Sequence, residues 1–275
     1  MEIEKDMGIN ASGGDDISNV SVLHTAINPF HYSIGSVVRD KIFEKMITGA
    51  GKVLDLGCGL GYFTDNLAKR NFTCEGIDLD DACIEYCQKY MRGSYKTGNI
   101  TKLSFLNSSF DYVLCSEVIE HIPDERLILE EANRVLKRGG VLVATVPCSS
   151  GIFGSLFKRI GHNNVDSNSL EYHWHKGYTK EQITELLAKY GFKVIEHKYT
   201  LIFMSEIVMA VTKIFVPLFI KKKINSQANA LEIKDKWIWK VYVKLFPILK
   251  AMCGIDRLLV KIMKGHMIIV KAVKI

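Results

Sequence analysis

Apolar and polar positions change their period several times along the chain, and each period predicts an element. Over residues 29–48 the apolar positions recur at the spacing of one helix face, which predicts a first helix. Beyond it, short apolar runs alternate with amphipathic stretches. The runs predict strands at 52–56, 73–79, 95–97, 110–115, 141–146, 192–199 and 266–272. The amphipathic stretches predict helices at 63–70, 81–91, 124–136 and 180–190.

The predicted strands are almost continuously apolar, so both of their faces should be buried. Strands of this kind, alternating with helices, are typical of a parallel sheet that carries helices on both sides. The pattern therefore predicts an α/β fold with a doubly wound, mostly parallel sheet, whose core is formed by residues 29–200 and 266–275. Residues 1–28, which begin with a polar stretch rich in Gly, Ser, Asp and Asn, are expected to be a mobile N-terminal segment.

Residues 201–265 have a different character and are predicted to form a helical insertion before the last strand. Their first part, residues 201–220, is apolar but is interrupted by Glu206, Lys213 and Pro217, so it is a poor candidate for a membrane span. Lysines follow at 221–223, and from residue 234 onward lysines alternate with aromatic and aliphatic residues at helical spacing. This pattern is typical of helices that lie on a membrane surface. The alternative is a lid that packs over the core and exposes its lysines.

Composition and charge narrow the function. The 275 residues are 48% apolar and 24% charged, which excludes a disordered or collagen-like chain. The net charge is +6, but residues 201–275 contain 14 Lys and Arg against 4 Asp and Glu, so the excess positive charge is local. Together with the absence of an N/D-P-P-Y/F motif after the fourth strand, this argues against nucleic acid as a partner.

The cysteines and the N-terminus bear on the compartment. The seven cysteines are odd in number and include no CxxC pair, which predicts reduced, partly buried thiols rather than disulfides or a zinc cluster. The chain starts with an acidic segment that offers no secretion signal. We therefore expect a cytoplasmic protein that contacts the membrane surface, if at all, from that side.

The most informative stretch joins the first strand to the next helix. It contains glycines spaced GxGxG at Gly57, Gly59 and Gly61, and Asp55 precedes them. Glycines permit a left-handed backbone and the close approach of a ligand, and ligands of open α/β sheets bind at the carboxyl ends of the strands. Asp78 ends the second strand 17 residues after Gly61, where a carboxylate can accept hydrogen bonds from both hydroxyls of a ribose. Dinucleotide sites typically have GxGxxG instead, and the preceding acid suits a cofactor with a cationic amino-acid part.

This arrangement resembles motif I of the class I S-adenosylmethionine-dependent methyltransferases, and Asp78 matches the ribose-binding acid of that family. The resemblance extends to the segments 98–100, 110–117, 136–143 and 190–192. It implies a seven-stranded, Rossmann-like fold with S-adenosylmethionine as cofactor. Asn99 departs from the commoner Asp, although an amide can still bond the adenine amine. The residues expected at the cofactor are Asp55, Gly57, Cys58, Gly59, Gly61, Asp78, Leu79, Asn99, Ile100, Cys115 and Glu117.

Within this family, residues 115–124 are similar to the same stretch of the ubiquinone-pathway O-methyltransferases. In that group an E-x-x-E-H constellation is implicated in holding a divalent cation, which implies Glu117, Glu120 and His121 as ligands of Mg²⁺, Mn²⁺ or Zn²⁺ here. Positions i, i+3 and i+4 of a helical turn share one face, so these side chains could converge. In many class I methyltransferases, however, the histidine of an E-H-x-x-D segment lines the pocket or caps the helix without a metal.

The expected reaction is an in-line displacement at the methyl carbon of a sulfonium, in which the enzyme aligns the nucleophile and removes its proton. His121 is the first candidate for this base, followed by His173 and His175. The apolar and basic insertion suggests an amphiphilic or lipid-linked acceptor. A soluble small molecule or sugar is the second hypothesis. The third is a non-catalytic adaptor that retains the fold and docks on membranes through residues 201–265.

Overall fold

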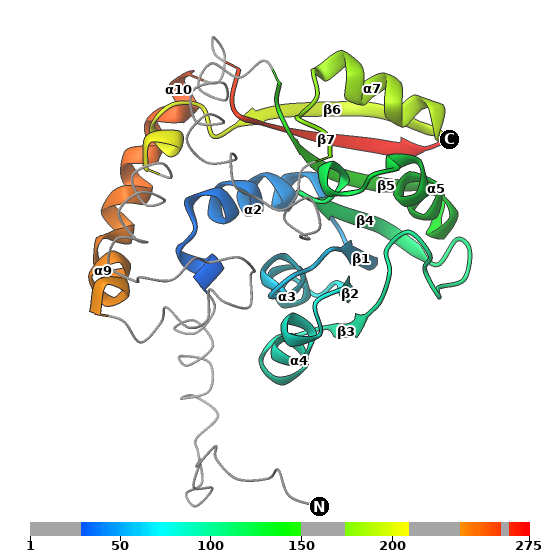
Figure 1. The fold of residues 1–275 in the computed structure, drawn as a ribbon, viewed down its shortest axis with the longest axis horizontal. Helices are drawn as coiled ribbons and strands as arrows, with labels where there is room; N and C mark the ends of the chain where they lie inside the picture. Colours follow the sequence, from blue (N-terminus) through cyan, green and yellow to red (C-terminus); the bar gives the residue numbers. More distant parts are fainter. Residues whose placement is uncertain (1–28, 150–173, 209–236, 260–263) are drawn as a thin grey trace, which may run out of the picture.

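Seven strands form a single mixed sheet in the order β3-β2-β1-β4-β5-β7-β6 (Figure 1). The computed structural model describes residues 29–149, 174–208, 237–259 and 264–275, so the N-terminal segment 1–28 lies outside it. All strand pairs are parallel except those of β7, which runs antiparallel to both β5 and β6. The strands are β1 Lys52–Leu56, β2 Thr73–Asp78, β3 Ser94–Thr97, β4 Phe110–Ser116, β5 Leu136–Pro147, β6 Phe192–Thr200 and β7 Met267–Lys274. The predicted doubly wound, mostly parallel sheet is confirmed.

Helices begin where short polar side chains cap their free N–H groups. Asp80 accepts from the N–H groups of Ala82 and Cys83, and Thr179 forms a capping box with Gln182. The helices of the core are η1 Pro29–Tyr32, α2 Ile34–Met46, α3 Tyr62–Lys69, α4 Asp81–Tyr90, η2 Ile119–His121, α5 Glu125–Val135 and α7 Lys180–Lys189. Between β6 and β7 lie α9 Trp237–Met252, η4 Cys253–Ile255 and α10 Asp256–Leu259.

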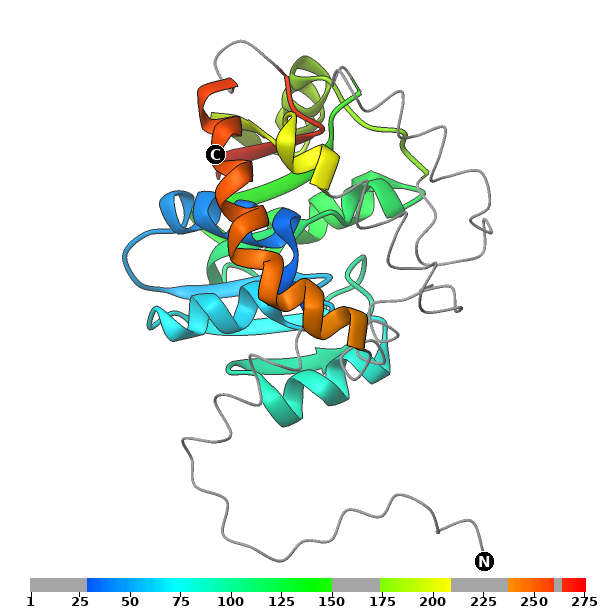
Figure 2. The same ribbon diagram turned by 90° about the vertical axis from the view of Figure 1, so that its left-hand side faces the viewer.

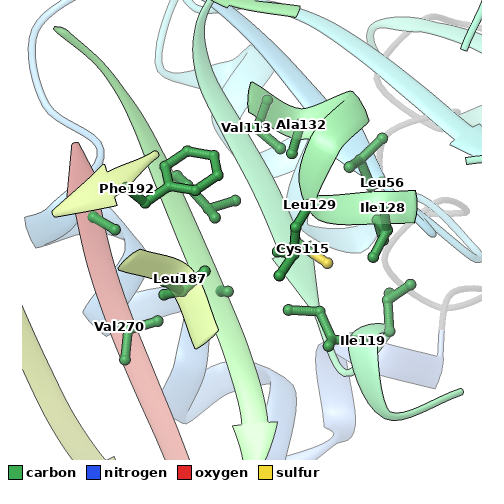
Figure 3. Close-up of a cluster of buried hydrophobic side chains, with 14 of the residues drawn as sticks. Leu56, Val113, Cys115, Ile119, Ile128, Leu129, Ala132, Leu187, Phe192 and Val270 are labelled. Carbon is green, nitrogen blue, oxygen red and sulfur yellow. The ribbon is translucent and has the colours of Figure 1, made fainter. Parts of the chain in front are cut away.

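The core has one apolar layer on each face of the sheet. Alternate residues of a strand point to opposite faces, so Val113 and Cys115 of β4 join one layer and Leu114 joins the other. The first layer packs against α5 and α7, and Figure 3 shows Ile128 and Leu129 of α5 and Leu187 of α7 among its buried side chains. The second packs against α2 and α3. The seven cysteines are all free and buried, as the sequence predicts.

Two predicted boundaries differ from the structure. The first helix is divided into η1 and α2, because Ser33 adopts an extended backbone and caps α2. Strand β5 begins at Leu136 rather than Val141, since Leu136 is extended and pairs with Phe110 beyond a register shift. The residues between the predicted helix and the predicted strand are therefore part of the strand.

The described part of the insertion before β7 is mainly helical, and α9 lies along the outside of the molecule next to α2 (Figures 1 and 2). Its inner side chains Tyr242 and Phe246 pack with Tyr32 and Ile34 in a separate apolar cluster. The Tyr242 hydroxyl also donates to the Tyr32 carbonyl oxygen at 2.6 Å. Residues 209–236, which include Lys213, Pro217 and the lysines 221–223, lie outside the described residues. Among the described helices, none is both long and apolar enough to cross a bilayer.

The cluster under α9 predicts a stability difference between adjacent residues. Phe246 is buried, whereas its neighbour Leu245 is half exposed. We expect Phe246→Ala to lower the free energy of unfolding by about 3 kcal/mol, because it leaves a cavity between α9 and α2. The matched Leu245→Ala should change it by less than about 0.5 kcal/mol. Chemical denaturation measures both, and equal losses would mean that α9 is not held through this cluster.

Candidate active site

The loop between β1 and α3 is shaped by its glycines. Gly57, Gly59 and Gly61 have φ angles of 70°, 50° and 73°, in the left-handed region that other residues rarely adopt. Space is equally restricted, because a Cβ added to Gly57 would lie 2.5 Å from a methyl carbon of Val118. A Cβ on Gly61 would lie 2.9 Å from the Cys87 sulfur. The loop therefore turns sharply and presents bare backbone at the carboxyl end of β1.

Hydrogen bonds attach this loop to the end of β2. The Gly57 and Cys58 N–H groups donate to the Ile77 carbonyl oxygen at 2.8 and 3.1 Å. The Gly59 N–H donates to Asp78 Oδ2 at 2.8 Å, and the Asp80 N–H donates to Asp78 Oδ1 at 3.0 Å. Each oxygen of Asp78 keeps a further lone pair. The carboxylate is thus fixed in place and can still accept hydrogen bonds from two ligand hydroxyls.

Asp55 and two thiols support the loop from below. The Asp55 carboxyl is buried and accepts from the Thr64 hydroxyl at 2.6 Å, which ties β1 to α3. Burial raises the pKa of Asp55 to about 7. The Cys87 thiol donates to the Gly59 carbonyl oxygen at 3.2 Å, and the Cys58 thiol lies 3.8 Å from the same oxygen. These groups are buried, so they stabilise the loop and have little surface with which to contact a ligand.

Leu79, Asn99 and Ile100, which are also predicted to lie at the cofactor, differ in how far their side chains are exposed. Leu79 is half exposed at the end of β2, and Asn99 is exposed at the end of β3. The Asn99 Oδ1 accepts from the N–H and the hydroxyl of Thr101 at 2.9 and 2.7 Å, so its amide nitrogen is the group available to a ligand. Ile100 is buried in the main core and supports this edge from beneath.

At the end of β4 the structure brings in a residue that the sequence reasoning missed. Arg39 of α2 is buried and donates to the Glu117 carboxylate, and its guanidinium lies 5.4 Å from the centre of the Phe63 ring. The Cys115 side chain, in contrast, points into the core (Figure 3), so only its main chain faces the site. The signal for Arg39 was present in the sequence. It lies on the same predicted helix face as Phe43 and Met46, where a charged residue needs a partner.

Several buried polar atoms in this region have no hydrogen-bond partner. They come from α2, from the end of β4, from η2 and from β5, and Thr145 of β5 pairs with Ser116 of β4. They are Ser36 Oγ, Arg39 Nε, Ser116 Oγ, both carboxyl oxygens of Glu120, and Thr145 Oγ1. Burial raises the pKa of Glu120 to about 8, although the charge of Arg39 lowers it. Because an unsatisfied buried polar group is costly, these atoms are the candidates in this region for contact with a polar partner.

The helical turn that the predicted metal site requires does not include all three of its residues. Glu117 has a left-handed backbone with φ of 57°, and Val118 has φ of −131°, so the helical turn includes only Ile119–His121. Glu117 therefore does not share a helix face with Glu120 and His121, and its carboxylate pairs with Arg39 instead. Within the part of the chain that the structure describes, no group of three or more His, Cys, Asp or Glu side chains could hold a metal ion.

The predicted bases lie in different surroundings. His121 ends η2, beside Glu120, and is half-buried. His175 approaches the same loop, since its N–H donates to the Glu120 carbonyl oxygen at 3.2 Å. Its ring Nε2 lies 3.1 Å from the Ile122 carbonyl oxygen and 3.4 Å from Glu125 Oε2, so that nitrogen is engaged. His173 lies outside the described residues.

A glycine loop at the carboxyl end of the first strand, with an acid at the end of the second, defines a class of domains that bind nucleoside-containing cofactors. Residues 36–197 match the family model described as a methyltransferase domain. The match covers more than half of the chain, and the chain therefore belongs to this methyltransferase family. The resemblance found in its motifs is confirmed.

Individual relatives share part of the chain. The ubiquinone biosynthesis O-methyltransferase of Coxiella burnetii is 33% identical over 111 residues, which are 38% of this chain and 47% of the relative. A probable S-adenosylmethionine-dependent methyltransferase of Mycolicibacterium smegmatis is 31% identical over 143 residues, 52% of each chain. The chain thus spans about half the length of the curated relatives it matches.

A solved structure shares the fold over most of the chain. Phosphoethanolamine N-methyltransferase 2 of Haemonchus contortus, in complex with S-adenosyl-L-methionine, superposes with a TM-score of 0.58 at 20% identity. The match covers 91% of this chain and 56% of that one. At this identity the likeness concerns the fold alone.

Asp78 provides a test of the cofactor site. We expect Asp78→Ala to weaken the binding of S-adenosylhomocysteine about 10- to 100-fold, because it removes the hydroxyl acceptor and releases the Gly59 N–H. Asp81→Ala is the matched control, since Asp81 is exposed on the first turn of α4. Isothermal titration calorimetry measures both affinities. Unchanged binding by the Asp78 variant would place the ribose elsewhere.

Glu120 predicts a pH dependence of stability. Its pKa is raised in the folded chain, so between about pH 4.5 and pH 8 the folded state retains a proton that the unfolded state releases. The free energy of unfolding should therefore fall as pH rises through this window. We expect the loss of free energy of unfolding across this window to be smaller in Glu120→Gln than in the wild type, by on the order of 1–3 kcal/mol. Denaturation at pH 5 and pH 8.5 measures it, with the exposed Glu85→Gln as control, and parallel pH profiles for wild type and Glu120→Gln would contradict the assignment.

Proposed function

We propose that this protein is an S-adenosylmethionine-dependent O-methyltransferase whose acceptor is a hydroxyl group of an amphiphilic, lipid-linked molecule at the cytoplasmic surface of a membrane. Membership of the methyltransferase family supports the reaction class. The unsatisfied polar atoms around Glu120 are the observation that supports a hydroxyl group as the acceptor.

The residues of the glycine loop fit the cofactor. The loop offers bare backbone where a Cβ would collide, and the Asp78 carboxylate is held with its remaining lone pairs free for the ribose hydroxyls. The leucine at position 79 is exposed beside it and offers an apolar surface for a base. When bound, S-adenosylmethionine supplies a methyl group on a positively charged sulfur, which is already activated for transfer.

The polar group around Glu120 fits a hydroxyl acceptor. A hydroxyl both donates and accepts, so it can satisfy a carboxylate oxygen of Glu120 and an N–H of Arg39 at once. Glu120, with its pKa raised to about 8, is a carboxylate above that pH and can then take the proton of an acidic hydroxyl, which strengthens the oxygen as a nucleophile. Glu120 thus joins His121 as a candidate base, and Arg39 would stabilise the carboxylate before the transfer.

The amphiphilic character of the acceptor is supported by two observations. The matched relatives include ubiquinone biosynthesis O-methyltransferases, and the helical insertion of this chain has an apolar and basic composition. A soluble small molecule or sugar is the alternative acceptor.

Labelled methyl donor tests the proposal directly. We expect tritium from S-adenosylmethionine to appear as an aryl ether on a prenylated catechol in detergent micelles, with kcat/KM at least about tenfold higher than for catechol itself, because the apolar tail adds binding energy. Glu120→Gln should retain the cofactor affinity but lose about 100-fold or more in kcat.

The outcomes separate the parts of the proposal. Equal rates with catechol and its prenylated form would remove the amphiphilic acceptor and favour a soluble one. Label on nitrogen acceptors alone would remove O-methylation, and label on carboxylate acceptors alone would remove the hydroxyl acceptor. Retention of the cofactor without transfer to any of these acceptors would favour a non-catalytic adaptor.

A further inference from the structure

The outward face of α9 carries an apolar stripe. Its members are separated by four, four, three and four residues, so at about 100° per residue they fall within an arc of about 80°. They are between 42% and 64% exposed, although they are large apolar side chains. The stripe consists of Trp237, Val241, Leu245, Ile248 and Met252. Figure 2 shows α9 running across the side of the molecule that faces the viewer.

The stripe is not the face by which α9 is attached to the protein. The neighbouring face, which is about 110° further round the helix and contains Tyr242, Phe246 and Leu249, packs against η1 and α2. A soluble helix normally has one apolar face and one polar face. Among the described residues, α9 packs through only one of its two apolar faces, and an exposed apolar face of this kind marks an interaction site.

Charged residues border the stripe on one side. Lys240 and Lys244 are exposed, and helical geometry places them about 20° to 60° from Trp237, next to the stripe. No acidic residue occurs within α9. Apolar side chains flanked by lysines and tryptophan are the combination that places a helix in the headgroup region of an anionic bilayer.

A second copy of the chain fits this face less well. A two-fold interface would be formed by the same patch from both copies, and it would bring the lysines of one α9 against those of the other. Like charges facing each other at an interface are unfavourable, whereas anionic lipid headgroups would neutralise them. The charge pattern therefore favours a lipid surface over self-association.

We propose that α9 lies flat on an anionic lipid bilayer, with the stripe in the headgroup region and Lys240 and Lys244 on the phosphates. This inference rests on the proposed function, because the bilayer contact would bring the enzyme to a lipid-linked acceptor. The inner face of α9 packs on α2, and α2 carries Arg39 to the end of β4. The bilayer contact is thereby separated from the candidate acceptor site by one helix.

Vesicle sedimentation tests the proposal with the full chain and without cofactor or acceptor. We expect binding to vesicles of phosphatidylcholine with phosphatidylglycerol, weaker binding at high salt, and little binding to phosphatidylcholine alone. The double substitution Leu245→Glu and Ile248→Glu should reduce binding about tenfold or more. The control is Leu106→Glu, which places the same charge at an 82% exposed leucine outside α9 and should leave binding unchanged.

A second variant and two further measurements fix the interpretation. Lys240→Gln with Lys244→Gln retains the apolar stripe and should reduce binding to anionic vesicles about threefold or more. Equal vesicle binding by wild type and the Leu245/Ile248 variant overturns the proposal. Absence of vesicle binding by the wild type also overturns the proposal. So does a concentration-dependent dimer that sedimentation velocity detects for the wild type and that the Leu245/Ile248 variant abolishes. Methyl transfer to the prenylated catechol in micelles is measured separately, so failure of the bilayer contact and failure of the proposed reaction are distinguishable.

Discussion

The hydrogen bond from the Gly59 N–H to the Asp78 carboxylate is the interaction on which the candidate cofactor site depends. It joins the loop after β1 to the end of β2, two segments that are adjacent only because their strands pair in parallel. The left-handed glycines make the bond geometrically accessible, and the Ile77 carbonyl and the thiol of Cys87 secure the loop on either side of it. Pre-organisation of this kind lowers the entropic cost of ordering a binding loop around its ligand.

The end of β4 shows how a neighbouring helix changes the chemistry of a motif. The carboxylates of the E-x-x-E-H segment could face a metal ion in principle, but α2 places the guanidinium of Arg39 beside them. Arg39 pairs with Glu117, and the charge of Arg39 also acts on the buried Glu120. Two carboxylates of one motif are thereby given different roles. Glu117 neutralises a buried cation, whereas the carboxyl oxygens of Glu120 are left without a hydrogen-bond partner and the pKa of this carboxyl is raised.

The insertion connects this region to the outer surface. Helix α9 uses one apolar face for α2 and exposes another, which is an unusual condition for a helix in water. Because α2 lies between α9 and the end of β4, residues that pack on one side of α2 influence the position of residues on the other. The apolar surface and the candidate acceptor site are consequently parts of one contiguous arrangement.

The fold class and the glycine loop could be predicted from the amino-acid sequence, because both depend on local information. Apolar runs of strand length, amphipathic helices and the glycine spacing of residues 57–61 each specify a conformation within a few neighbouring residues. The beginning of β5 at Leu136 was not evident, since it depends on pairing with Phe110 in another strand.

The chemistry at the end of β4, in contrast, depends on contacts between segments that are far apart in the sequence. The convergence predicted for Glu117, Glu120 and His121 assumed a regular helical turn, and the left-handed Glu117 removes that turn. The role of Arg39 could not be assigned from spacing, because 78 residues separate it from Glu117 along the chain. Which face of α9 is packed and which is exposed was likewise decided by contacts with α2, and a helix that is apolar on two sides carries no local signal that distinguishes them.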